Sequence, residues 1–162
     1  IKGLIKLKLI DFSFNSKELS LLGADIPMCI KSEDCIAEGI GEKLKSYKSF
    51  PKVFFVLVKP KLSLSTKKIY SSFVRKNIFR SSQQNDQKND LESIAINLYP
   101  EIQDILIRLS KFKKILFFRM TGSGSCCYGA FHNLEEAKIV MQQLIKEYPD
   151  YWLYITKNKT IN

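Results

Sequence analysis

From residue 50 onward, apolar and polar positions follow the periods of strands and of amphipathic helices. Residues 53–58, V-F-F-V-L-V, form a continuous run of β-type residues, which predicts a strand buried on both faces. Apolar side chains recur every three or four positions across residues 134–148, which predicts a helix with one apolar face. Asn133 precedes this helix and Glu136 stands at its third position, which is the spacing of a capping box.

Other segments of this region alternate in the same way. The pattern predicts helices over 67–74, 91–98 and 100–109, and strands over 115–118, 126–131 and 152–156. The resulting order, β-α-α-α-β-β-α-β, resembles a split βαβ, ferredoxin-like sandwich with extra helices. We therefore expect residues 50–162 to form an α+β domain that could fold alone.

Residues 1–46 hold shorter predicted elements. In chain order they are the end of a helix at 1–10, a helix at 16–22, a turn at 23–25, a strand at 26–30, and two short strands around a glycine turn within 36–44. Pro27 interrupts the 26–30 segment and marks it as an edge strand. These elements include few apolar residues and no complete layer, so we expect them to be part of a domain.

The loop between the strands predicted at 115–118 and 126–131 has no bulky side chain. It lies within M-T-G-S-G-S-C-C-Y-G-A-F, residues 120–131, and consists of Thr121, Gly122, Ser123, Gly124 and Ser125. Its backbone can approach a phosphate or another loop closely, or it can simply be a wide hairpin connection. It is neither a Walker loop nor a dinucleotide fingerprint, because no G-K-[ST] follows and no third glycine stands where a helix begins.

The chain carries a net charge of +10, with 26 basic and 16 acidic residues. Most of the excess lies in residues 43–88, which hold twelve Lys or Arg and a single acid, Asp86. A basic face can bind nucleic acid, anionic lipid or a phosphorylated small molecule. Alternatively, the excess of 22 lysines over 4 arginines reflects an A/T-rich gene and a solvated surface.

The cysteines and the single histidine do not form a metal-binding pattern. Cys29, Cys35, Cys126 and Cys127 include no C-x-x-C, and His132 has no partner at ligand spacing. We expect four reduced thiols that behave as small buried apolar groups, no metal, and a cytoplasmic protein. No apolar run approaches the length of a membrane helix, so we expect no membrane association.

A few polar side chains are candidates for chemistry. Asp25 follows a predicted turn, where it could accept backbone hydrogen bonds or take a proton from an alcohol. Lys59 and Lys61 flank Pro60 at the end of the 53–58 strand, where they could meet a phosphate or remain solvated.

Several of these segments together resemble the GHMP small-molecule kinases. Residues 120–131 are similar to the third motif of that family. L-L-G-A-D-I-P at 21–27, A-E-G-I-G-E-K-L at 37–44 and V-L-V-K-P-K-L-S-L-S-T-K-K-I-Y at 56–70 resemble successive segments of one member. The resemblance implies a GHMP kinase fold, in which residues 1–46 are the end of the N-terminal domain and residues 50–162 the ferredoxin-like C-terminal domain.

The resemblance also implies an activity. Such a kinase would use ATP with Mg²⁺ to phosphorylate the 2-hydroxyl of a CDP-linked methylerythritol in non-mevalonate isoprenoid synthesis. Asp25 maps onto the catalytic aspartate, which acts as the base or orients the hydroxyl. The loop from Thr121 to Ser125 maps onto a motif that lines the site and supports the phosphate-binding loop.

The family's phosphate loop, P-x-G-x-G-L-G-G-G-S-S, and its N-terminal lysine have no counterpart in these 162 residues. We therefore expect a truncated kinase that is inactive alone, or one completed by a separately encoded N-terminal fragment. The alternative is a non-catalytic basic module that binds RNA or another polyanion. No recognisable RNA-binding sheet motif with interleaved aromatic residues is present, so nucleic acid is the less favoured partner.

Overall fold

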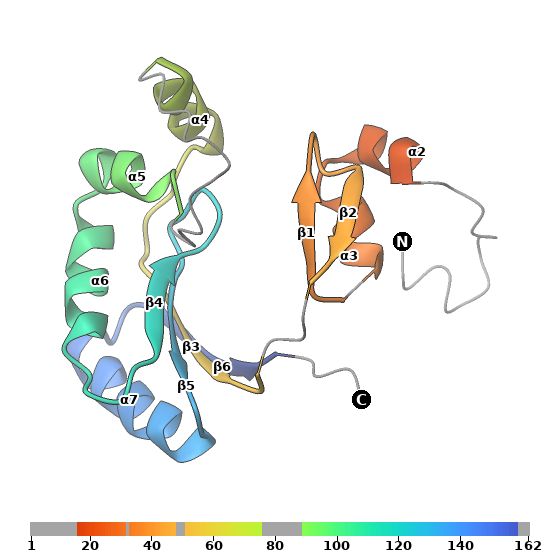
Figure 1. Ribbon diagram of the computed structural model, residues 1–162. Coiled ribbons are helices and arrows are strands. Elements are labelled where there is room, and N and C mark those ends of the chain that lie inside the picture. Colours follow the sequence, from red (N-terminus) through yellow and green to blue (C-terminus); the bar gives the residue numbers. More distant parts are fainter. Residues whose placement is uncertain (1–15, 32, 48–50, 76–88, 159–162) are drawn as a thin grey trace. The chain divides into compact units, whose positions relative to one another are not determined.

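The computed structural model describes residues 16–31, 33–47, 51–75 and 89–158 (Figure 1). The expected helix end at 1–10 lies outside the described residues. The chain divides into two compact units, Ile1–Pro51 with Thr160–Asn162, and Lys52–Lys159, each described here by itself. Among the described helices, none is long and apolar enough to cross a membrane.

The described residues of the first unit form two short helices and a hairpin. Helix α2, Ser16–Leu22, is where the sequence predicted it, and strands β1, Cys35–Glu38, and β2, Lys43–Ser46, pair antiparallel around the predicted glycine turn. The strand prediction at 26–30 is wrong, because Ile26–Lys31 is helix α3.

Pro27 explains the error in this segment. It is the second residue of α3, and the first turn of a helix tolerates proline because its N–H groups have no partner within the helix. The Cys29 amide donates to the Asp25 carbonyl at 3.0 Å, which closes the first helical turn. Pro27 is also buried, so it anchors the helix and does not mark a sheet edge.

The second unit is an antiparallel sheet with helices. Its elements in chain order are β3 Phe54–Lys59, α4 Thr66–Arg75, α5 Glu92–Leu98, α6 Glu101–Ser110, β4 Phe117–Met120, β5 Cys127–Phe131, α7 Leu134–Glu147 and β6 Trp152–Lys157. The sheet order is β4-β5-β3-β6, and every neighbouring pair is antiparallel. This confirms the predicted order of elements and the α+β class.

Helices α6 and α7 lie on one face of this sheet, and the core lies beneath them (Figure 1). Val56 and Val58 of β3 are fully buried on that face. Phe55 and Leu57 point to the other face and are only partly buried, so the prediction of a strand buried on both faces is wrong. The rings of Phe117 and Tyr128 shield this second face in part, because Tyr128 meets Phe55 edge-on at 5.6 Å and Phe117 at 6.2 Å.

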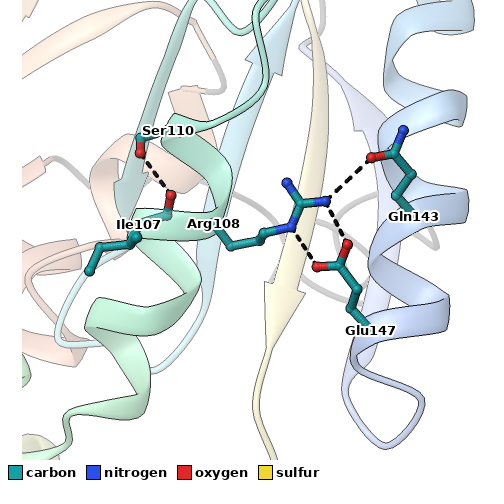
Figure 2. Close-up of polar contacts among 5 residues, drawn as sticks. All are labelled: Ile107, Arg108, Ser110, Gln143 and Glu147. Atoms are coloured by element: carbon teal, nitrogen blue, oxygen red, sulfur yellow. Dashed lines mark hydrogen bonds and ion pairs between the residues drawn. The ribbon is translucent and has the colours of Figure 1, made fainter.

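The predicted capping box starts α7. The Asn133 side chain accepts a hydrogen bond from the Glu136 amide at 2.9 Å, which satisfies one of the free donors of the first turn. Further along, Arg108 of α6 reaches across to α7 (Figure 2). Its guanidinium donates to both carboxylate oxygens of Glu147, at 2.5 and 2.6 Å, and to Gln143 at 3.3 Å.

We expect Glu147→Gln to lower the free energy of unfolding at neutral pH by about 0.5–1 kcal/mol, as for a well-oriented surface pair. The hydrogen bond from Arg108 lowers the pKa of Glu147 below its usual value, so the contribution is present above the unfolded pKa. It is lost as the pH falls through the lowered folded pKa. Urea unfolding at pH 7 and near pH 3 measures this, and the two proteins should converge at the lower pH.

Glu135→Gln is the matched control for this change. Glu135 pairs with Lys138 three residues along the same helix, and its side chain is 76% exposed against 40% for Glu147. Solvent screening should therefore leave its effect smaller than that of Glu147→Gln. If the two variants lose equal free energy of unfolding at pH 7, the Arg108–Glu147 ion pair between α6 and α7 contributes no more than an ordinary surface pair.

Candidate functional site

The glycine loop, residues 121–125, closes the hairpin between β4 and β5. The Thr121 amide donates to the Cys126 carbonyl at 2.8 Å, and the Gly124 amide donates to the Thr121 carbonyl at 3.0 Å. The peptide between Gly124 and Ser125 is cis. Ser125 is buried, whereas Thr121 and Gly122 are exposed, so the loop presents its first half to solvent.

The two glycines of the loop are required for different reasons. Gly124 has φ +91°, and a Cβ there would lie 2.7 Å from the Met120 sulfur and 3.1 Å from a Leu64 methyl carbon. Packing therefore leaves no room for a side chain at Gly124. Gly122 has φ +54°, and a Cβ there would meet nothing within 4 Å, so the space beside it is open.

The open side of the loop carries two available donors. Within the part of the chain that the structure describes, the backbone N–H groups of Gly122 and Ser123 have no hydrogen-bond acceptor. Successive amides of this kind in a loop without bulky side chains can bind the oxygens of an anion. The residues present therefore fit the approach of a phosphate group, although they do not form a complete cradle.

Three side chains that sequence reasoning did not single out hold this loop. Asn89 donates from its side-chain amide to the carbonyls of Met120 and Gly122, and Glu92 accepts from the Met120 amide. The Thr66 hydroxyl, at the start of α4, is 3.0 Å from the hydroxyl of Ser123. The sequence does mark two of these residues, because Asn89 and Glu92 are three residues apart just before a helical apolar pattern, a spacing typical of the start of a helix.

Asp25 lies in the first unit, in the turn that precedes α3. It is exposed, and no described residue forms a hydrogen bond or an ion pair with its carboxylate. An exposed carboxylate without a partner is available to accept a proton from a bound alcohol. Asp25 and the glycine loop belong to different units, so the structure places each within its own unit.

The β1–β2 hairpin packs against the turn that carries Asp25. Gly41 has φ +99°, and a Cβ there would lie 2.1 Å from the carbonyl oxygen of Ala24. The Glu42 carboxylate accepts from the Ile40 amide at 2.7 Å and stabilises the tip of the hairpin. Hydrogen bonds from the backbone N–H groups of Glu42 and Ile40 lower the pKa of that carboxyl.

The two lysines at the end of β3 line an open pocket of about 580 Å³, together with Pro60, Leu62 and residues 150–152. Lys61 forms an ion pair with Asp150 at 2.9 Å, and both side chains are more than 70% exposed. The ion pair favours a solvated surface role for Lys61 over phosphate binding, because the carboxylate of Asp150 offsets the charge of the lysine. Lys59 lines the same pocket.

The cysteines differ in their surroundings more than the sequence predicted. Cys127 is buried and Cys126 is partly buried, and burial raises the pKa of both thiols. They therefore stay protonated and are poor nucleophiles. Cys29 is exposed, so the prediction that all four are buried is wrong. No group of three potential metal ligands occurs among the described residues.

The sequence matches a family model and several known kinases. Residues 74–150 match the family model of the GHMP kinases C terminal. The chain is 34% identical over 152 residues to the 4-diphosphocytidyl-2-C-methyl-D-erythritol kinase of Ehrlichia canis. The matched region covers 84% of this chain and 54% of that protein. The enzyme of the same name from Chelativorans sp. is 33% identical over 151 residues, covering 85% of this chain and 51% of that protein.

A solved structure shows the same fold. The crystal structure of a 4-(cytidine 5'-diphospho)-2C-methyl-D-erythritol kinase superposes with a TM-score of 0.76 at 22% identity, covering 98% of this chain and 62% of that one. The chain spans about half the length of the curated relatives it matches. Residues 74–150 therefore belong to the C-terminal domain of the GHMP kinase family.

Proposed function

We propose that this chain supplies the C-terminal part of an ATP-dependent kinase that phosphorylates 4-diphosphocytidyl-2-C-methyl-D-erythritol at its 2-hydroxyl. The observation that carries the proposal is the identity of about one third, over more than four fifths of the chain, to kinases named for that substrate. We assign residues 1–46 to the end of the kinase's N-terminal domain and residues 50–162 to its C-terminal domain.

The proposed roles follow from the chemistry of the exposed groups. ATP with Mg²⁺ would supply the phosphoryl group to be transferred. Asp25 would accept the proton of the attacking hydroxyl, because its carboxylate is exposed and has no partner among the described residues. The amides of Gly122 and Ser123 would donate to phosphate oxygens and help to neutralise the charge that phosphoryl transfer carries.

Phosphoryl transfer depends on positioning and on charge neutralisation, and the open side of the glycine loop presents the amides of Gly122 and Ser123 alone. We therefore infer that activity requires further parts of the kinase fold. These would be encoded upstream of Ile1 or supplied by a separate N-terminal fragment. Cysteines that form no disulfide and the use of ATP fit a cytoplasmic protein.

A transfer assay tests the proposal. The kinase preparation is this chain expressed with any coding sequence that precedes Ile1 in frame, or, where none exists, co-expressed with the N-terminal part of the Ehrlichia canis relative. We expect labelled phosphate to pass from ATP to 4-diphosphocytidyl-2-C-methyl-D-erythritol in this preparation, and not with the 162 residues alone. A preparation in which the two protein parts associate and ATP and the acceptor bind, but no phosphate is transferred, would overturn the proposal.

A further inference from the structure

The side chains that contact the glycine loop come from segments that are distant from it in sequence. Asn89 and Glu92 lie at the start of α5, about thirty residues before the loop, and Thr66 begins α4. Asn89 binds Met120, just before the loop, and Gly122 within it, whereas Thr66 of α4 contacts Ser123. The loop is therefore fixed from outside its own hairpin.

Asn89 makes the most specific of these contacts. Its Nδ2 donates to the Met120 carbonyl at 3.0 Å and to the Gly122 carbonyl at 2.7 Å. Its Oδ1 accepts from the Leu91 amide at 3.0 Å, at the beginning of α5. Of the polar side chains of this size, only asparagine offers two N–H donors and an acceptor in this arrangement.

Glu92 completes the contact with Met120. Its Oε2 accepts from the Met120 amide at 2.9 Å, and its own amide donates to the Asn89 carbonyl at 3.0 Å. The backbone of Met120 is thus held at both its N–H and its C=O group, immediately before the loop begins. A backbone hydrogen bond also joins Glu92 to Asn89, so the two residues that hold Met120 belong to the same turn.

We propose that Asn89 and Glu92 are positioning residues for the kinase reaction, an inference that rests on the proposed function. Asn89 donates to the carbonyl groups of Met120 and Gly122, and Glu92 accepts from the amide of Met120. Together they fix the orientation of the following peptides. The amides of Gly122 and Ser123 then remain as the donors available to a phosphate group of the nucleotide-linked substrate or of ATP. Small displacements of such donors reduce catalysis strongly.

Asn89→Asp is the decisive variant. It keeps the size of the side chain and the oxygen that accepts from Leu91, but it removes both N–H donors and places a carboxylate beside two carbonyl oxygens. Asn133→Asp is the matched control, because the Asn133 side chain uses only its oxygen, which accepts from Glu136, and aspartate caps a helix equally well.

Two measurements separate the outcomes. Amide hydrogen exchange on the 162-residue chain should be at least tenfold faster at Thr121 and Gly124 in Asn89→Asp, and unchanged there in Asn133→Asp. In the kinase preparation, Asn89→Asp should raise the KM for ATP or for the CDP-linked substrate at least fivefold. A purely structural defect would lower the amount of folded enzyme and leave KM unchanged.

Each negative result has a distinct meaning. Unchanged exchange at Thr121 and Gly124 would overturn the inference, because the loop would then be held without Asn89. Faster exchange with unchanged KM values would also overturn it, since the contact would then be structural only. A wild-type preparation without activity would overturn the proposed function, and the positioning role would fall with it whatever the exchange result.

Discussion

Asp25→Asn should reduce kcat of the kinase preparation by a factor of about 10²–10⁴, the usual contribution of a general base. The amide has the same shape as the carboxylate but cannot take the hydroxyl proton. Asp25 is exposed in the turn before α3, and its carboxylate has no partner in the described part of the chain, so the substitution breaks no contact among the described residues. The stability of the protein should therefore stay unchanged while the rate falls.

Initial rates at saturating ATP and acceptor measure this loss. Asp150→Asn is the matched control, because Asp150 is also an exposed aspartate but forms only a surface ion pair with Lys61. It should retain nearly full activity. An Asp25→Asn enzyme with more than half of the wild-type kcat would show that another group accepts the proton.

Phe131→Ala should lower the free energy of unfolding of the second unit by about 3–5 kcal/mol. Phe131 ends β5, is fully buried, and is the largest side chain of the buried core. Its removal loses the transfer free energy of the ring and leaves a cavity that the sheet and α7 can close only in part. A loss of this size is a large fraction of the stability of a typical domain.

Urea unfolding followed by circular dichroism measures the change, with the slope against denaturant expected to stay the same. Ile145→Ala is the control, since Ile145 lies on α7 but is 47% exposed. It should change stability by no more than about 0.5 kcal/mol. A loss below about 1 kcal/mol for Phe131→Ala would mean that the core collapses around the missing ring.

Periodic segments were predictable, because burial of one face imposes a period that the sequence displays. The capping box of Asn133 and Glu136 and the order of elements in the second unit are examples. Pro27 misled the prediction because proline ends strands and also begins helices, and only the Gly23–Asp25 turn before it decides between them. The partial exposure of Phe55 depends on which sheet face the helices cover, which local sequence does not specify.

The candidate site was predictable in its motifs but not in its supports. The glycine loop and Asp25 are marked by residue types that alter backbone freedom or carry charge. Asn89 and Glu92 come at the end of a long polar stretch, and their spacing indicates the start of a helix but no contact with a distant loop. Their role depends on a hydrogen bond across about thirty residues of chain, which only the folded backbone defines.

Gly41 of the β1–β2 hairpin lies so close to the Ala24 carbonyl that a movement of the hairpin would also move the turn that carries the proposed base, Asp25. At 2.1 Å from that oxygen, even a methyl group at position 41 would have to displace either the hairpin tip or the turn next to Asp25. The turn that carries the carboxylate is thus in contact with a hairpin whose tip lies 16 residues further along the chain. Mutations or binding partners that tilt the hairpin would shift the proposed proton acceptor without touching it.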